Sequence, residues 1–534
     1  MPVRLPAALL PLRGPVFRGL WFAWLIANTT MWINDVAAGW LMTTLTTSAV
    51  MVALVQTAST LPVFLLGLPS GALADIVDRR RYFAGTQLWV SLNALLIAGL
   101  ALGGWLDATL LLVLTFANGI GLAMRWPVFS AIVPEVVSRA DLPSALALNA
   151  ISMNLARVVG PVIAGGLLAS AGVAWVFVLN AAMAALAFGL IVRWRSEPRS
   201  SALPGERFVG AMRVGLQHVR ESPRMRIVML RVFLFFLQAS ALLALMPLVA
   251  RQLHGGGPGI YTLLMSCMGA GAIGAALLFP RWRLRWSRDK FVRWGTVVHS
   301  SMSALAVLSG EVWLAAPAIF VVGAAWISIA NTLSMSAQLA LPNWVRARGM
   351  SMFQMSVMGG TAFGAMVFGQ VASWSSVPAA IVAAALVGPV VLLATRQMSV
   401  EGGDEDLSPA RPGVAPEVAI EVGPDEGPVM VTVEYLVDPA RAAEFAQVME
   451  ATRSARLRQG ALSWGLFRDT SVPGRYVEYF VDETWVEHLR RHERFTAADT
   501  DLRARRLVFH VGEAPPQVRR YVAESFSQAP SMLQ

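Results

Sequence analysis

Long apolar runs, separated by short polar or charged breaks, follow one another from Phe17 to about Arg396. Each run holds about 20 nearly uncharged residues, enough for a helix to cross a hydrocarbon core of roughly 30 Å. The pattern therefore predicts an all-α membrane part with twelve transmembrane helices. The predicted spans are 17–41, 48–72, 82–104, 108–133, 143–170, 173–193, 227–251, 259–280, 290–309, 312–337, 347–371 and 376–396.

After Arg396 the pattern changes to that of a soluble chain. Residues 399–428 are acidic and rich in proline and glycine, which is typical of a linker. Residues 429–534 then predict a small α+β domain with the order βαββαβ, which is the ferredoxin-like arrangement. We expect a strand at 429–437, a helix at 439–459, a hairpin across Pro473 and Gly474, one helix over 485–506 and a last strand over 507–512.

The composition agrees with a membrane protein and excludes a nucleic-acid partner. Of all residues, 56% are hydrophobic and 14% are charged, whereas soluble domains carry roughly 25% charged residues. The net charge is +10, but the excess of arginine and lysine lies within residues 1–399. Since the soluble tail is balanced in charge, no basic domain is available to hold a phosphate backbone.

The distribution of arginine and lysine predicts the orientation, because cytoplasmic loops carry an excess of these residues. With the N-terminus inside, 24 cationic residues fall in cytoplasmic segments and Arg251 alone falls outside. Both termini are therefore expected in the cytoplasm. The spans divide six and six, into an N-terminal bundle at 1–195, a cytoplasmic central loop at 196–226 and a C-terminal bundle at 227–398.

Two further features of this part concern lipid and duplication. The central loop contains "RFVGAMRVGLQHVRESP", which is apolar on one helical face and basic on the other, so we expect it to lie on membrane lipid. Similar cytoplasmic turns follow Pro134 and Pro342. The repeat suggests two duplicated six-helix bundles, from which many alternating-access carriers are built.

The stretch "GALADIVDRRR", from Gly71 to Arg81, lies at the predicted turn between the second and third spans. The orientation rule explains its arginines, but it explains neither Asp75 nor Gly71, whose missing side chain permits close helix approach. A carboxylate here could accept hydrogen bonds from the start of a neighbouring helix and pair with an arginine. We therefore expect a conformational latch made of Gly71, Asp75, Asp78, Arg79 and Arg80.

Four charged residues stand out inside the predicted spans, where charge is costly and indicates function by default. Asp35 is a candidate carboxylate for proton coupling, or else it lies near the outer surface and is simply hydrated. Arg157 matches Asp35 in depth and is its expected partner. Arg125 would suit a polar or anionic substrate, although either arginine could instead tie helices together, and Arg231 is close enough to the cytoplasm for a structural role. Asn154 is one of several amides expected to line a cavity.

The stretch at 71–81 resembles the signature loop of the major facilitator superfamily, Gly-x-Leu-Ala-Asp-Arg-x-Gly-Arg-Arg. "DRR" at 78–80 and "LALNAISMNLARVVGPVIAGG" at 146–166 are similar to the branch that contains the enterobactin exporter. The resemblance implies a secondary carrier of the bacterial inner membrane. It would export a small organic molecule, siderophore or drug-like, in exchange for protons, and its partners would be that substrate, protons and membrane lipid.

The same resemblance assigns roles to individual residues. It implies that Asp75 contacts the start of the eleventh span and stabilises the outward-facing state. It also implies that Gly160, Pro161 and Gly165 belong to the span-five motif of antiporters. No P-loop of the form G-x-x-x-x-G-K-[ST] is present, so a pump driven by its own ATPase is not expected.

The tail resembles the antibiotic-biosynthesis-monooxygenase fold, whose members commonly dimerise through the sheet, so a homodimer is one expectation. Trp464, Tyr479 and Trp485 could line a cleft there, but no cofactor motif or nucleophile accompanies them. We therefore expect no cofactor and favour a regulatory or oligomerising module over an enzyme. His488 and His492 share a helical face, yet nothing supplies further metal ligands. The alternative is a bifunctional or sensor protein whose tail binds or oxidises a ligand linked to transport.

Overall fold

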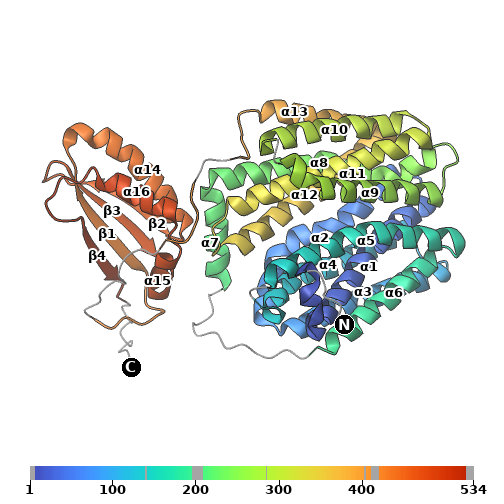
Figure 1. Cartoon of the computed structure of the whole chain (residues 1–534), viewed down its shortest axis with the longest axis horizontal. Helices are drawn as coiled ribbons and strands as arrows, with labels where there is room; N and C mark the ends of the chain where they lie inside the picture. Colours follow the sequence, from blue (N-terminus) through green and yellow to red (C-terminus); the bar gives the residue numbers. More distant parts are fainter. Residues whose placement is uncertain are drawn as a thin grey trace, which may run out of the picture. The chain divides into compact units, whose positions relative to one another are not determined.

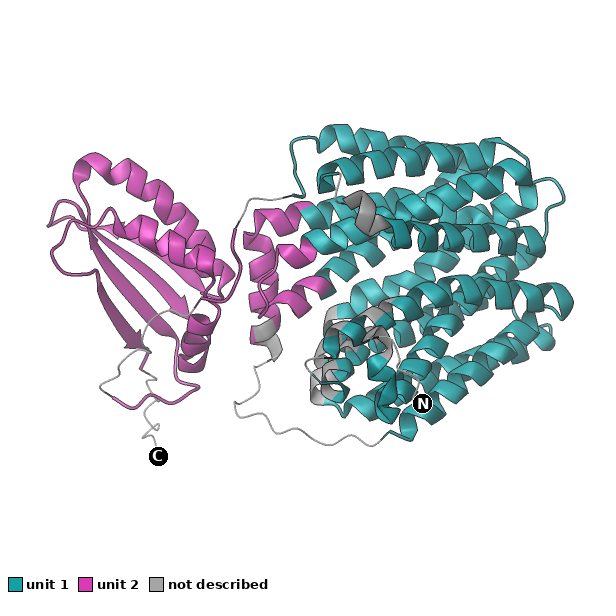
Figure 2. Cartoon of the chain, in the orientation of Figure 1, with its two compact units in different colours: residues 1–203, 228–336, 351–401 teal, residues 204–227, 337–350, 402–534 magenta. Residues whose placement is uncertain are grey.

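The computed structural model describes residues 7–138, 141–194, 208–283, 286–401, 405–410 and 420–524, with some side chains inside these ranges left undescribed. The chain divides into two compact units (Figure 2). Unit 1 contains residues 1–203, 228–336 and 351–401. Unit 2 contains residues 204–227, 337–350 and 402–534. Each unit is described by itself.

Unit 1 is built from long helices that lie where the apolar runs of the sequence lie (Figure 1). The first six are α1 Pro15–Leu45, α2 Ala49–Ile76, α3 Arg79–Leu102, α4 Ala108–Val136, α5 Leu142–Ser170 and α6 Val173–Val192, preceded by the short 3-10 helix Ala7–Arg13. The others are α8 Pro223–Gln252, α9 Pro258–Arg283, α10 Arg288–Leu308, α11 Val312–Leu339, α12 Arg346–Trp374 and α13 Val377–Ala394. The ends of α8, α11 and α12 extend into unit 2.

Ten of these helices are long and apolar enough to cross a membrane, counted over the described residues. The remaining two, α1 and α10, have the length but a lower mean hydropathy. Several helices begin at a polar cap, as local chemistry requires, because the first amides of a helix lack intrahelical acceptors. For example, the Asp107 carboxylate accepts a hydrogen bond from the Leu110 amide at the start of α4 (2.7 Å).

One apolar core cluster of the described residues joins the two halves of unit 1. We call the end where α1 begins and α13 ends the terminal end. At the opposite end, one core cluster contains residues of both halves, such as Met42 in α1 and Leu264 in α9. At the terminal end, the described cluster around Trp24 and Phe129 contains residues of the N-terminal half alone. The halves are therefore sealed together away from the terminal end.

Unit 2 contains a four-stranded antiparallel sheet in the order β2-β3-β1-β4. Its elements are β1 Val429–Leu436, α14 Ala442–Arg458, β2 Ser463–Arg468, β3 Arg475–Asp482, α15 Trp485–Glu493, α16 Ala497–Leu507 and β4 Gln517–Val522. Alternate residues of β1, from Val429 to Tyr435, are buried and pack with Phe445 of α14. The alternation visible in the sequence thus separates a core face of the sheet from an open face.

Two sequence-based predictions for the tail are wrong. The helix predicted over 485–506 is interrupted, because Thr496 forms a capping box with Asp499 that starts a new helix, α16. The last strand is 517–522 and not 507–512. Leu507 ends α16, and in the segment that follows only an isolated bridge joins His510 to Val437 within the described chain.

The helix α7 Phe208–Glu221, from the central loop, packs on the tail within unit 2. Its Arg213 forms an ion pair with Glu483 (2.7 Å), and the Gln217 side chain donates to the carbonyl of Ala461 (2.7 Å). Val214 on its apolar face is buried and lies next to Gly460. The expectation that this apolar face rests on lipid is therefore corrected, since protein covers it.

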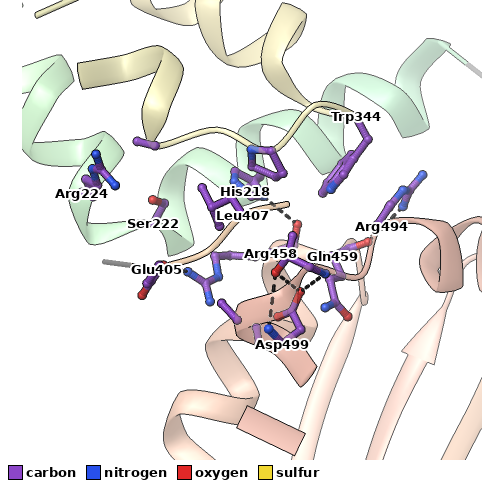
Figure 3. Close-up of a pocket in the computed structure, with 15 residues that line it drawn as sticks. His218, Ser222, Arg224, Trp344, Glu405, Leu407, Arg458, Gln459, Arg494 and Asp499 are labelled. Atoms are coloured by element: carbon purple, nitrogen blue, oxygen red, sulfur yellow. Dashed lines mark hydrogen bonds and ion pairs between the residues drawn. The ribbon is translucent and has the colours of Figure 1, made fainter. Parts of the chain in front are cut away.

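The segment between α11 and α12 belongs to the same junction, which Figure 3 shows. His218 of α7 donates from Nδ1 to the Arg458 carbonyl (3.1 Å) and meets the Trp344 ring edge-on at 5.4 Å. Arg494 lies over the same tryptophan, 5.1 Å from the ring centroid. The tail thus binds two connecting segments of the membrane part through one small cluster.

Acidification should loosen α7 from the tail. Burial lowers the pKa of His218 from its usual 6.5 to about 4. Because the folded unit favours the neutral ring, the contact has its full strength above pH 6.5 and loses it as the pH falls toward 4. Hydrogen exchange of the α7 amides, corrected for the intrinsic effect of pH, should therefore rise over that range.

The control for this prediction is a ring that cannot titrate. His218→Phe should make the exchange of α7 independent of pH over the same range. His254→Phe, in a loop of unit 1, should leave the wild-type pH dependence in place. A pH dependence that persists unchanged in His218→Phe would show that another group is responsible.

Candidate functional site

A cavity of about 580 Å³ lies inside unit 1, between the two six-helix halves. Its walls come from α1, α2, α4 and α5 on one side and from α8, α9, α11 and α12 on the other. Most of the lining is apolar or aromatic, with several methionines, whose flexible side chains adapt to varied shapes. The amides that line it are Gln56, Asn149, Asn154, Asn331 and Gln354.

Asp35 is the one carboxylate among the described residues that line this cavity. It lies on α1, and its Oδ1 accepts a hydrogen bond from the Ser59 hydroxyl of α2 (3.2 Å). The side chain is half-buried, so it faces the cavity and is not part of the sealed core. A carboxylate with one weak polar partner and access to the cavity is placed to exchange a proton with its contents.

Arg157, on α5, is held by aromatic rings from both halves. Its guanidinium lies 4.6 Å from the ring centroid of Trp326 in α11 and 5.5 Å from that of Trp32 in α1. Its Nε and Nη1 have no hydrogen-bond partner among the described residues. No ion pair joins it to Asp35 in the described part of the chain, although both line the cavity. The cavity therefore contains a cation whose charge no described anion neutralises at close range.

The other two arginines singled out inside predicted spans bond to backbone carbonyls. Arg125 does not line the cavity: it donates to the Ala27 carbonyl of α1, and its guanidinium lies 5.4 Å from the ring centroid of Trp24. Arg231 donates to the carbonyls of Thr395 (2.7 Å) and Met398 (2.9 Å), which joins α8 to the chain after α13. Such bonds compensate buried charge and connect neighbouring elements.

The span-five residues lie at close helix crossings beside the site. A Cβ at Gly160 would lie 2.5 Å from the Cβ of Trp32 in α1, and a Cβ at Gly165 would lie 1.7 Å from Oγ1 of Thr262 in α9. Pro161 lies inside the helix between them. Because these glycines carry no side chain, α5 can approach both α1 and the opposite half.

The predicted latch is described only in part. Asp78 caps α3 by accepting from the Arg81 amide (2.9 Å), and Arg80 donates to the Val192 carbonyl at the end of α6. The placement of Gly71 and Asp75 lies outside the described side chains, and for Arg79 no individual contact is described.

Sequence reasoning missed several residues that shape the cavity. Ser59, Trp32, Trp326 and Tyr261 were not singled out, yet all four line it. For Trp32 a signal exists, because it stands three residues before Asp35 on one face of the helix. For Ser59 and Trp326 no local pattern distinguishes them, since their partners come from other helices.

In the tail, the aromatic residues expected in a cleft have other neighbours. Trp464 donates to the buried Glu478 carboxylate (3.1 Å), Tyr479 stacks with Phe467, and Trp485 belongs to the core. His488 and His492 meet edge-on, with ring centroids 5.2 Å apart. Among the described residues, no group of three His, Cys, Asp or Glu could hold a metal ion.

Comparisons with known proteins agree with this architecture. A family model described as "Transmembrane secretion effector" (MFS_3) matches residues 6–528. The staphyloferrin A transporter of Staphylococcus aureus (strain NCTC 8325 / PS 47) is 22% identical over 254 residues, which cover 47% of this chain and 63% of the relative. The multidrug efflux pump Tap of Mycolicibacterium fortuitum is 33% identical over 165 residues, which cover 30% of this chain and 40% of the relative. The matches thus span less than two thirds of these relatives.

Two solved structures share the fold at low sequence identity. The nucleoside transporter NupG aligns with a TM-score of 0.58 and 13% identity, over 72% of this chain and 98% of its own. A bacterial homolog to the human lysosomal transporter Spinster, in an inward-facing and occupied conformation, aligns with a TM-score of 0.58 and 15% identity, over 74% of this chain and 99% of its own.

The crossing of α5 and α9 should not tolerate a side chain at Gly165. We expect Gly165→Val to separate the two helices, because overpacking a close contact costs about 1–3 kcal/mol. Hydrogen exchange of the first turns of α9 should then rise by about tenfold or more, since each 1.4 kcal/mol is a factor of ten.

The neighbouring glycine supplies the matched control. A Cβ at Gly166 meets nothing within 4 Å, so Gly166→Val should leave the exchange of α9 unchanged. Equal effects of the two substitutions would contradict the assignment of Gly165 to the helix crossing.

Proposed function

Because the chain belongs to the transmembrane secretion effector family, and is thus a membrane transporter of the major facilitator type rather than an enzyme, we propose that it exports a small organic molecule in exchange for protons. The cavity between the two halves carries this proposal. Its single carboxylate and its aromatic-held arginine lie in an otherwise largely apolar lining. Siderophores and drug-like molecules, which combine polar groups with apolar parts, match such walls.

The orientation and topology belong to the same proposal. Twelve spans, with both termini in the cytoplasm of a bacterial cell and the protein in its inner membrane, fit the arginine distribution. In this orientation the core cluster shared by both halves closes the outer side, so the cavity would face inward. Export would then require the halves to separate at the α5–α9 crossing and to close at the terminal end.

We assign the coupled steps to three charged residues. Asp35 would take up a proton from the outer side and release it inward. Arg157, which lies between rings from both halves, would bind an acidic group of the substrate, and Asn154 would add hydrogen bonding. Arg125, through its bonds to α1, would hold the helix that carries Asp35 in position.

The latch and the tail complete the proposal. Asp75 and Gly71, with Asp78, Arg79 and Arg80, would stabilise one conformation at the terminal end. In the tail, the open face of the sheet exposes the apolar side chains Met430, Phe467 and Tyr521. A second copy covering this face would give a homodimer, and the strand order fits the ferredoxin-like arrangement.

Asp35→Asn should abolish the effect of a proton gradient on transport, because an amide cannot exchange the coupled proton. The measurement is uptake of a panel of siderophores and fluorescent drugs into inverted membrane vesicles, with and without an imposed pH gradient. The exposed Glu311 at the start of α11 provides the control. Glu311→Gln should keep the gradient effect, and a gradient effect that survives Asp35→Asn would refute this coupling site.

Arg157→Met should impair transport of acidic substrates selectively. Loss of a charged hydrogen-bond donor costs about 1.5–3 kcal/mol, or roughly tenfold to a hundredfold in apparent affinity. Uncharged substrates of the panel should keep theirs. Arg251→Met removes an arginine that also lies over a tryptophan, Trp40, but outside the cavity, and it should leave both classes unchanged. Equal losses for acidic and uncharged substrates would contradict the role of Arg157.

A further inference from the structure

A second cavity, of about 210 Å³, lies within the tail, between the core face of the sheet and the helices α15 and α16. Its volume corresponds to about seven water molecules at ~30 Å³ each. Apolar side chains of β1 and β3, including Val431, Val433 and Phe480, form one wall. No part of the proposed transport cycle uses this space.

Five arginines line this cavity, and no described carboxylate does. They come from four elements: Arg456 from α14, Arg491 from α15, Arg503 and Arg506 from α16, and Arg520 from β4. Residues so far apart in the sequence converge only because the sheet and helices bring them together. Five positive side chains around one small cavity strongly repel one another unless anions are present.

The protein supplies two of those anions from beneath the cavity. Glu478 pairs with Arg456 (2.9 Å), and Asp482 pairs with Arg491 (3.1 Å), and both carboxylates are fully buried on β3. Burial by itself raises the pKa of each carboxyl, but the nearby arginines outweigh it and hold the pKa below its usual value. The pKa of Glu478 is about 2. Both carboxylates are thus ionised.

The other three arginines have no ion-pair partner among the described residues. This holds for Arg503, Arg506 and Arg520, so the cavity keeps an excess of positive charge. Arg491 is 3% exposed, yet its Nη1 has no hydrogen-bond partner in the described structure. A buried, charged donor left without an acceptor costs more than an ordinary missing hydrogen bond.

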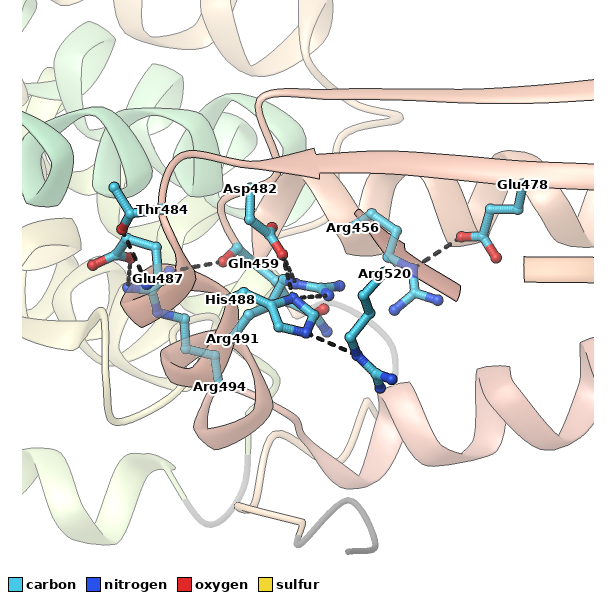
Figure 4. Close-up of polar contacts among 10 residues, drawn as sticks. All are labelled: Arg456, Gln459, Glu478, Asp482, Thr484, Glu487, His488, Arg491, Arg494 and Arg520. Carbon is cyan, nitrogen blue, oxygen red and sulfur yellow. Dashed lines mark hydrogen bonds and ion pairs between the residues drawn. The ribbon is translucent and has the colours of Figure 1, made fainter. Parts of the chain in front are cut away.

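Three of the arginines, Arg456, Arg491 and Arg520, are held by polar contacts within the protein, as Figure 4 shows. His488 donates from Nδ1 to Asp482 (2.8 Å), and its Nε2 accepts from Nε of Arg520 (3.2 Å). Arg491 lies over the ring of Phe480, 3.9 Å from its centroid. Because the protein has already fixed these side chains, an incoming anion would lose little free energy in ordering them.

We propose that this cavity binds an organic carboxylate, whose anionic group pairs with Arg491 and Arg520 and whose apolar part lies on Val431, Val433 and Phe480. Arginine recognises carboxylates through two parallel donors, and the apolar wall excludes water from the pair. The site lies in the tail and is separate from Arg157 in the membrane part. The tail is thereby a ligand-binding domain.

The probe for this site is 4-fluorobenzoate, observed by fluorine NMR with the full-length protein in detergent. Wild type should bind it at millimolar concentration, and the uncharged analogue 4-fluorobenzyl alcohol should bind at least about tenfold more weakly, because it lacks the charged acceptor. Arg520→Gln and Arg503→Gln should each weaken benzoate binding by about tenfold or more, since each removes a charged donor or an attracting charge.

Matched controls test position rather than charge alone. Arg519→Gln, on the opposite face of β4, and Arg505→Gln, two residues along α16, make the same charge change outside the cavity and should leave binding unchanged. Arg157→Met, in the central cavity, should also leave it unchanged, so failure of the export proposal would remain distinguishable. Unaltered hydrogen exchange of β1 would show that each variant keeps the tail folded.

Three outcomes would overturn the proposal. The first is equal binding of benzoate and the alcohol, which would mean an apolar cleft without anion recognition. The second is loss of binding in Arg157→Met with none in Arg520→Gln, which would place the carboxylate in the transport cavity. The third is equal weakening by Arg519→Gln and Arg520→Gln, which would indicate a general charge effect on the surface.

Discussion

The crossing of α5 and α9 has no space for a side chain at Gly165, and the arrangement of the membrane part depends on this contact. Because the two helices belong to different halves, their close approach seals one end of the bundle. At the terminal end the described core of the N-terminal half stands by itself. The central cavity lies between these two ends of the bundle. The missing side chain at Gly165 is thus one steric condition for the halves to meet, and the close approach of Gly369 in α12 to Ala53 in α2 is another.

Burial of charge is the second constraint, and the arginines inside the helices of unit 1 meet it in two different ways. Arg125 and Arg231 donate to backbone carbonyls, which replace the hydration that they lose. Arg157 has aromatic rings in place of carbonyls, and two of its nitrogens lack described partners. The rings hold the guanidinium in place without using its N–H donors as hydrogen bonds to carbonyls would.

The sequence was sufficient for features that depend on local pattern. Apolar runs located the helices of unit 1, and alternation located β1 and β3, because both follow from the period of the secondary structure. Asp35 and Arg157 were found because charge inside an apolar run is unusual. The sequence did not show how these two residues are related in space. No ion pair joins them in the described structure, and Trp326 reaches Arg157 from the other half. Likewise Thr496, which divides α15 from α16, was read as part of one helix, because the apolar period continues across the break.

Long-range contacts in unit 2 were also beyond the sequence. The apolar face of α7 indicated a lipid surface, yet Val214 is covered by the tail. In the tail, Arg491 and Arg506 are almost fully buried, which the sequence pattern did not predict. For α7, amphipathic periodicity showed that one helical face is covered, but it could not identify the covering partner.

Two features of unit 2 share one short helical segment: the arginine-lined cavity and the contact with Trp344. Arg491 at the end of α15 faces the arginine-lined cavity, while Arg494, three residues later, lies over Trp344 in the segment between α11 and α12. Arg494 is also bonded to the Gln459 carbonyl (3.0 Å) and to Glu487 (2.7 Å), so it moves with α15 and α14 together. An anion that pulls Arg491 inward must therefore act on the element that carries Arg494. Both arginines therefore belong to one set of contacts within unit 2, which joins the helices of the tail to the segment between α11 and α12.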